Sequence, residues 1–167
     1  SSDNEQIWKM NEIEDMDTMQ LPRRQGIIYH AVMSRIRHVS DLERSVRQAI
    51  ADGLIDSCEG DMLAERLGQA LTGEKSGQWF DGFTRLLNER TLCTFNNKKN
   101  KICHHRPDRV VWCADGSIHV VDFKFGNEEP PKYIRQVRYY MSVISKLYPD
   151  VNVKGWLWWP IQDKFIE

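Results

Sequence analysis

The stretch from residue 102 to residue 125 constrains the fold most, because it joins two apolar, strand-like segments that carry charged residues. Val, Ile and aromatic residues dominate both segments, and an Asp-Gly turn separates them, which is the pattern of two paired strands. Asp122 and Lys124 lie in the second segment. A strand places residues two apart on one face, so these two side chains are predicted to lie about 6.6 Å apart on the same side of a sheet.

The turn decides whether Asp108, on the first segment, shares that face with Asp122. A two-residue loop at Asp115 and Gly116 would place the two aspartates on opposite faces of the sheet. A three-residue loop over residues 114–116, with Gly116 left-handed in a G1 bulge, sets Asp108 directly opposite Asp122, with the Cβ atoms about 5 Å apart. The second register also pairs apolar residues with apolar residues. We therefore predict the bulged turn, or an equivalent single bulge elsewhere in the hairpin.

The composition limits the class of protein. A chain of 167 residues with 41% hydrophobic and 28% charged residues is expected to form one domain over residues 21–167, preceded by an acidic linker or tail over residues 1–20. It contains no apolar run of membrane-spanning length and no signal peptide, which predicts no membrane partner and a cytoplasmic location, in the bacterial cytosol or nucleoid. A net charge of −1 leaves room only for a local basic patch that could contact nucleic acid.

Hydrophobic periodicity predicts a helical half followed by a strand-rich half. We predict helices over residues 26–39, 40–54, 59–71, 78–88 and 130–148, a three-strand meander over 91–95, 102–113 and 117–125, and a final strand over 153–159. This order indicates a mixed α/β fold with an N-terminal helical region. The tryptophans of the final strand, Trp156, Trp158 and Trp159, are interpreted as core residues in preference to base-stacking ones.

Two aspartates in contact repel each other unless a cation lies between them, and their hard oxygen atoms favour Mg²⁺ or Mn²⁺. Such an ion beside a phosphodiester can activate a water molecule, and Lys124 could stabilise the charge that develops on the phosphate. On exposed strands, however, Asp-x-Lys is also a common ion-paired pattern. The apolar neighbours of Asp122 favour the functional interpretation.

Four segments together resemble the PD-(D/E)xK nuclease superfamily, and specifically the RecB-like nuclease domains at the C-terminus of UvrD/AddA-type helicases. They are G-I-I-Y-H at residues 26–30, R-P-D-R-V-V at 106–111, V-D-F-K-F-G at 121–126 and Q-V-R-Y-Y at 136–140. The resemblance implies a restriction-endonuclease-like core and a Mg²⁺- or Mn²⁺-dependent deoxyribonuclease, with exonuclease action favoured. It also implies DNA ends as substrate and a helicase motor fused in the full-length protein.

The resemblance assigns roles to individual residues. It implies that Lys124 is the catalytic lysine and that the metal ligands are His30, Asp108, Asp122 and the Phe123 carbonyl. It also implies that Gln136 and Tyr140 line the site and touch DNA. Helical periodicity by itself places His30 opposite an apolar stripe and predicts an exposed side chain. Glu89 is a candidate for an additional acid, and Arg106 and Arg109 are candidates for phosphate contacts.

Several other sites are not predicted. The four cysteines, at positions 58, 93, 103 and 113, have no C-x-x-C spacing, so no zinc site is expected. Some RecB-like domains hold an iron-sulfur cluster with one early and three late cysteines, and because the last cysteine here precedes Asp122, the resemblance implies no cluster in this chain. Gly68 and Gly73 have the spacing of a phosphate-binding loop, but Glu74 follows where a lysine is needed, so no bound nucleotide is expected. Two alternatives stay open: a catalytically silent DNA- or partner-binding module of the same fold, and a freestanding restriction-like or viral exonuclease.

Overall fold

The computed structural model describes residues 21–88, 92–96, 101–126 and 130–167. The elements within these ranges are α2 (Leu21–Ser34), the 3₁₀ turn η2 (Val39–Asp41), α3 (Leu42–Ala51), α4 (Ser57–Leu71), the 3₁₀ turn η3 (Gly77–Trp79), β1 (Arg85–Asn88), β2 (Leu92–Asn96), β3 (Lys101–His105), β4 (Arg109–Trp112), β5 (Ile118–Phe123), α5 (Pro130–Leu147), β6 (Val153–Trp159) and β7 (Lys164–Ile166). No helix in the described ranges combines the length and apolar character needed to cross a membrane.

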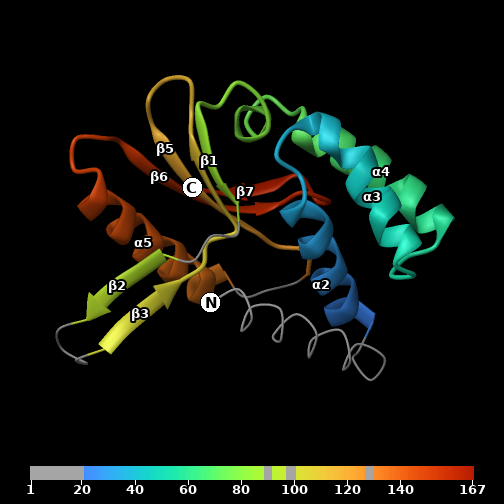
Figure 1. Ribbon diagram of the computed structural model, residues 1–167, viewed down its shortest axis with the longest axis horizontal. Helices are drawn as coiled ribbons and strands as arrows, with labels where there is room; N and C mark the ends of the chain where they lie inside the picture. The colour runs from blue at the N-terminus through green and yellow to red at the C-terminus, as the bar shows by residue number, and fades with distance from the viewer. Residues whose placement is uncertain (1–20, 89–91, 97–100, 127–129) are drawn as a thin grey trace.

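A mixed five-stranded sheet runs through the molecule in the order β1-β4-β5-β6-β7 (Figure 1). Strands β5 and β6 are parallel and are connected through α5, whereas the other neighbouring pairs are antiparallel. Strands β2 and β3 form a separate two-stranded sheet. The mixed α/β class predicted from the sequence is confirmed.

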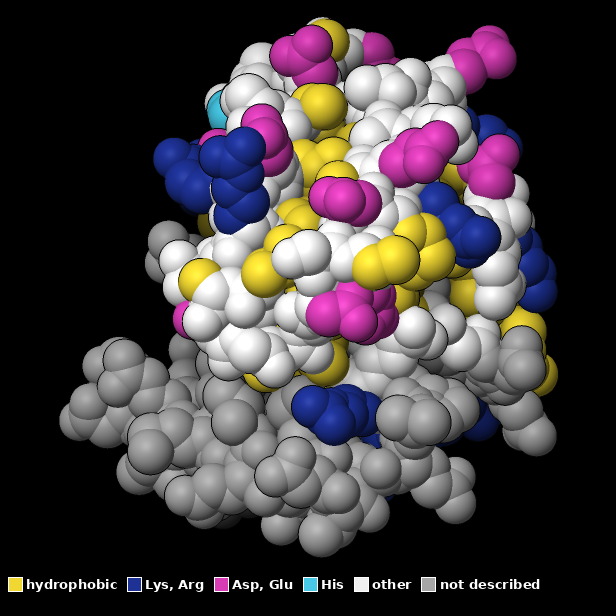
Figure 2. Space-filling view, turned by 90° about the vertical axis from the view of Figure 1, so that its right-hand side faces the viewer, with side chains coloured by type: hydrophobic (Ala, Val, Ile, Leu, Met, Phe, Trp, Pro, Cys, Tyr) yellow, Lys and Arg dark blue, Asp and Glu magenta, His cyan; other side chains and the backbone are white. Residues whose placement is uncertain are grey.

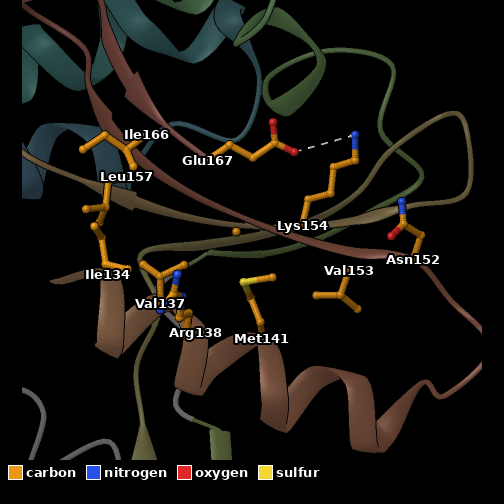
Figure 3. Close-up of a pocket in the computed structure, with 11 residues that line it drawn as sticks. Ile134, Val137, Arg138, Met141, Asn152, Val153, Lys154, Leu157, Ile166 and Glu167 are labelled. Atoms are coloured by element: carbon orange, nitrogen blue, oxygen red, sulfur yellow. Dashed lines mark ion pairs between the residues drawn. The ribbon is translucent and has the colours of Figure 1, made fainter. Parts of the chain in front are cut away.

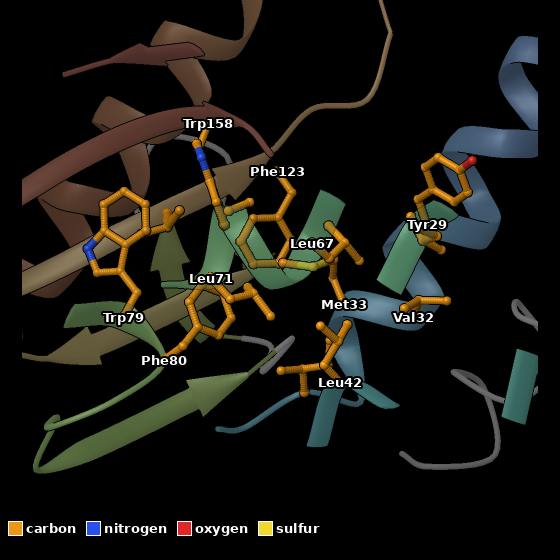
Figure 4. Close-up of a cluster of buried hydrophobic side chains, with 14 of the residues drawn as sticks. Tyr29, Val32, Met33, Leu42, Leu67, Leu71, Trp79, Phe80, Phe123 and Trp158 are labelled. Atoms are coloured by element: carbon orange, nitrogen blue, oxygen red, sulfur yellow. The ribbon is translucent and has the colours of Figure 1, made fainter. Parts of the chain in front are cut away.

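Helices cover both faces of the main sheet, with α2, α3 and α4 on one side and α5 on the other (Figure 1). The strands alternate accordingly: Val121 and Phe123 face α2 and α4, and Val120 faces α5. Figure 4 shows the larger apolar cluster, in which Phe80 and Trp158 pack with Phe123. Trp156, Trp158 and Trp159 are all buried, as predicted, which excludes free base-stacking surfaces.

Helix α5 lies very close to β6 at Gly155. A Cβ atom at this position would lie 2.3 Å from Met141 Sδ and 2.7 Å from Val137 Cγ1, so only glycine permits this approach. Figure 3 shows both side chains directed at the strand, beside a pocket of about 420 Å³ between α5 and the β7 edge. Lys154 and Glu167 lie at this pocket, which is separate from the predicted site residues.

The helix predicted over residues 78–88 is wrong. Trp79 and Phe80 are buried after a single 3₁₀ turn, but Gly82 has a φ of +71°, which a right-handed helix cannot contain. The chain then continues as β1, which pairs with β4. The large apolar residues of this segment are spaced like those of a buried helix. In the structure a turn buries the first of them and a strand buries the later ones, so the spacing does not indicate a helix here.

The predicted three-strand meander is also wrong. Residues 102–113 form two strands, because β3 ends at His105 and β4 begins only at Arg109, after Pro107. Proline has no N–H for the ladder, and it restricts the residue before it. Strand β2 therefore pairs with β3 outside the main sheet. The predicted bounds of β6 are confirmed, whereas the short β7 was not predicted.

Candidate functional site

The hairpin between β4 and β5 contains the predicted bulged turn. Gly116 has a φ of +85°, its N–H donates to Cys113 O (3.0 Å), and the Cys113 N–H donates to Ser117 O (2.9 Å). The register of β4 and β5 continues from this pair without a further bulge. One step beyond the start of β4, the same register sets Asp108 opposite Asp122. The geometric condition for a shared site is therefore met.

Asp108 and Asp122 face each other at a position where the ladder has no hydrogen bonds between the strands, which brings side chains closest. Asp122 is 5% exposed, and its carboxyl group is hydrogen-bonded to that of Asp108. Asp108 Oδ2 also accepts the Phe123 N–H (2.8 Å). The Lys124 N–H donates to Trp158 O on β6 (2.8 Å), so the trans peptide directs the Phe123 carbonyl the opposite way, towards the β4 side.

Lys124 lies between a carboxyl group and an aromatic ring. Its Nζ is 2.9 Å from Asp122 Oδ2 and 3.7 Å from the ring centroid of Tyr133 on α5. The side chain is almost completely buried. The prediction that Asp122 and Lys124 share a face of β5 is confirmed by this ion pair.

Helix α2 brings His30 to the same cluster. Its Nδ1 lies 3.6 Å from Asp108 Oδ1, and the side chain is 30% exposed. The ring packs edge-on against Phe125 at 5.1 Å and tilted against Phe123 at 6.3 Å. Helical periodicity predicted an exposed residue because it describes one helix alone, whereas this side chain covers the end of β5.

Burial and neighbouring charges shift the pKa values of the two aspartates in opposite directions. Burial raises the pKa of Asp122 well above its usual value, and the Asp108 carboxylate raises it further, against the effect of Lys124. Burial acts upward on the pKa of Asp108 as well, but the positive charge of His30 and hydrogen bonds outweigh it and lower that pKa. Asp122 therefore holds a proton at pH values where an exposed aspartate is ionised.

The donor atoms here are of the type that Mg²⁺ and Mn²⁺ bind: two carboxylates, an imidazole and a main-chain carbonyl. The contact between the two buried acids supports this fit, because a cation relieves their repulsion. Within the described part of the chain, however, no three His, Cys, Asp or Glu side chains are already arranged around one ion position. The acid oxygens instead bond to each other, to the Lys124 ammonium and to the Phe123 N–H.

Gln136 and Tyr140 lie beside this cluster on one face of α5. Gln136 Nε2 donates to Tyr140 Oη (2.8 Å), and Tyr140 Oη donates to Arg106 O (3.4 Å). Burial raises the pKa of Tyr140, and the negative charge of Asp122 raises it further. Gln136 and Arg106 are exposed. The structure thus brings these three residues together, and their contact with DNA stays a prediction.

Arg109 points to the opposite face of the sheet. Its guanidinium is fully buried and donates to Trp79 O (2.9 Å), Ile36 O (2.6 Å) and Arg37 O (2.6 Å), and it stacks 4.1 Å from the Phe80 ring centroid. Burial lowers its pKa to about 9, so it stays charged at neutral pH. Because this group is inaccessible, the prediction that Arg109 contacts phosphate is wrong.

Tyr133 belongs to the cluster but was not predicted. It precedes Tyr140 by seven residues on α5, and this spacing places both on one helix face, which was the signal available in the sequence. Glu89, the candidate for an additional acid, lies outside the described residues.

Charged side chains lie on the outer face of the helices and at the start of α5. Figure 2 shows acidic side chains spread over the centre of the helical face, with basic side chains on either side of them. On α4, Asp61 and Glu65 are exposed. The exposed Lys132 and Arg135 lie instead on the first turns of α5, next to the site.

No protein-family model matches this chain, and no curated protein matches it either.

Proposed function

We propose that this chain is a metal-dependent DNA nuclease domain with a restriction-endonuclease-like core, acting on single- or double-stranded DNA ends in the cytosol. The observation that carries the proposal is the buried contact of Asp108 with Asp122, next to the Lys124 ammonium. Burying two acids against each other is unfavourable for folding. Groups with strongly shifted pKa values cluster at functional sites, which favours a catalytic interpretation of this pair.

Each residue has a role in this proposal. Asp108, Asp122 and His30, with the Phe123 carbonyl, would hold Mg²⁺ or Mn²⁺, and the ion would supply a polarised phosphate and an acidified water molecule. Lys124 contributes a fixed positive charge that stabilises the negative charge developing on the phosphate oxygens. Gln136 and Arg106 at the rim would position the DNA backbone, and a helicase motor in the same polypeptide would deliver the strand.

The test is cleavage of end-labelled linear DNA, single- and double-stranded, by the purified chain with Mn²⁺ or Mg²⁺. Asp122→Asn and Lys124→Met are expected to abolish most cleavage. Asp150→Asn and Lys146→Met are matched controls, because both residues are exposed and lie away from the cluster. Equal rates in all five proteins, wild type included, would overturn the proposal.

One observation favours a second candidate, a catalytically silent module that binds DNA or a protein partner. The described residues contain no preformed arrangement of three metal-binding side chains. Burial and Asp108 raise the pKa of Asp122, which favours its protonated form, and metal binding needs the deprotonated one. Calorimetric titration with Mn²⁺ separates the two candidates. Heat of binding that is lost in Asp122→Asn supports the nuclease. No heat at millimolar Mn²⁺, together with DNA binding measured by fluorescence anisotropy, supports the silent module.

A further inference from the structure

We propose that Tyr133 is a positioning residue that holds the Lys124 ammonium in place through a cation–π contact. The inference rests on the nuclease function proposed above and concerns the same site. Lys124 Nζ lies 3.7 Å from the Tyr133 ring centroid. The other lysine–aromatic contacts among the described residues are longer: 4.4 Å for Lys164 over Trp159, and 5.1 Å or more for Lys75 and Lys132.

A lysine at this position needs a second contact. The ammonium is a point charge on a flexible four-carbon chain, and its ion pair with Asp122 comes from the same strand face. A metal ion held by Asp122 would compete with Lys124 for the same carboxyl oxygens and would weaken that ion pair. The Tyr133 ring approaches from α5, so its contact with the ammonium would not depend on Asp122.

An aromatic ring suits this task better than another acid. The face of a ring attracts a cation through its quadrupole and adds no net charge. A third carboxylate beside Lys124 would neutralise the charge that the reaction uses and would compete for the metal. The ring restrains Lys124 without doing either.

The packing of α5 fixes the ring. Tyr133 is half-buried and packs against the apolar cluster between α5 and the sheet, one helical turn before the buried Val137 and two turns before the buried Tyr140. Both anchors lie on the same helix face. The ring can therefore be altered while the two anchors keep α5 in place.

The test compares Tyr133→Phe, which keeps the ring, with Tyr133→Leu, which keeps apolar bulk without a π face. Tyr133→Phe should retain the kcat of metal-dependent DNA cleavage, and Tyr133→Leu should lower it roughly 3- to 30-fold with little change in KM. Phenylalanines with one, two and three ring fluorines at position 133 should lower kcat stepwise, because fluorine weakens the quadrupole at nearly constant size. Tyr148→Leu is the matched control. That ring packs against Trp112 and its Oη accepts from Arg85, far from Lys124, so kcat should not change.

A second readout does not depend on activity. In the wild-type chain the ring current should shift the Lys124 Hε resonances upfield of those of the other lysines, and Tyr133→Leu should remove the shift. An unshifted Lys124, or an unchanged kcat in Tyr133→Leu and across the fluorinated series while Asp122→Asn is inactive, overturns the positioning role and leaves the nuclease proposal standing. A wild-type chain that cleaves no DNA with either metal overturns both.

Discussion

Strand β5 buries polar side chains on both faces, and the hydrogen-bond and charge partners of these side chains differ between the two faces. On the helical face, His119 Nδ1 accepts hydrogen bonds from Trp79 Nε1 (3.0 Å) and Trp156 Nε1 (3.1 Å), and its Nε2 lies 3.1 Å from Ser117 Oγ. On the α5 face, Asp122 contacts another acid and needs Lys124 to offset the repulsion. The first network is satisfied by neutral partners, whereas the second contains an unfavourable contact.

This difference separates structural from functional polar residues. A buried network in which every group has a partner stabilises one packing arrangement and needs no further explanation. A buried contact between two carboxyl groups that raises the pKa of one of them lowers stability at neutral pH, so its presence indicates a use other than folding. Arg109 belongs with the first set, because its charge is satisfied by backbone carbonyls alone.

The largest expected effect is a separation of activity from stability in Asp122→Asn. Cleavage should fall by more than roughly 100-fold. Loss of a group that only supports a metal ligand costs up to about 100-fold, so a direct ligand should cost more. The free energy of unfolding at pH 7, measured by urea with a chelator present, should rise by about 0.5 to 2 kcal/mol. A raised carboxyl pKa lowers native stability as the pH rises above the unfolded value, and Asn removes that effect while keeping a hydrogen-bonding side chain. A less stable variant would contradict this interpretation of the α5 face.

The opposite result is expected for His119→Leu. It leaves the indole N–H groups of Trp79 and Trp156 buried without their acceptor, which should lower the free energy of unfolding by about 2 to 6 kcal/mol. The cleavage rate per folded molecule should stay at the wild-type value. Two buried N–H donors without an acceptor should cost more than about 1 kcal/mol, so a smaller loss of unfolding free energy would contradict the structural role of His119.

Arg109→Lys tests the reassignment of this residue from DNA contact to structure. Lysine keeps the charge but cannot reproduce the planar fork that reaches three carbonyls, so the free energy of unfolding should fall by about 1 to 3 kcal/mol. Arg109→Gln removes the charge, and its DNA affinity, measured by anisotropy as a function of salt, should keep the wild-type slope, whereas Arg106→Gln should reduce the slope by about 1 if Arg106 contacts a phosphate. A slope reduced by about 1 in Arg109→Gln would restore the original prediction.

The sequence was sufficient for those parts of the site that depend on local rules. The odd residue in the turn at Gly116 and the period-2 alternation of β5 together predict that Asp108, Asp122 and Lys124 meet, and the structure has this register. Turn chemistry and strand alternation involve only neighbouring residues. These local rules therefore hold independently of how the rest of the chain packs.

Tertiary features were beyond these rules. Periodicity cannot tell that α2 ends beside β5, so His30 entered only through resemblance, and Tyr133 was overlooked although its helix was correctly predicted. Arg109 was misassigned because sequence proximity to Asp108 says nothing about the opposite face of a strand. The aromatic residues at 79 and 80 produced a helix prediction because burial by a turn and burial by a helix look alike over a few residues.

The smallest expected effect compares the two histidines through the pH dependence of stability. Burial lowers the pKa of His119, so the native state disfavours the proton, and its contribution to stability is present above about pH 6.5 and is lost as the pH falls. Burial also acts to lower the pKa of His30, but the charge of Asp108 outweighs it and raises that pKa. The His30 contribution is therefore present below about pH 6.5 and is lost as the pH rises.

Because the two contributions have opposite signs, they offset each other in the wild-type chain between about pH 5.5 and 7.5, and single variants should reveal them. Urea unfolding of His119→Gln should show stability that rises as the pH falls, and His30→Gln should show stability that falls, each by at most about 1.4 kcal/mol per pH unit. Each variant then reports on the face of β5 that still carries its histidine. The other ionisable groups are common to both variants, so the difference between the two pH profiles isolates His30 and His119. A difference of zero, or one of the opposite sign, would refute the opposite electrostatic environments of the two faces.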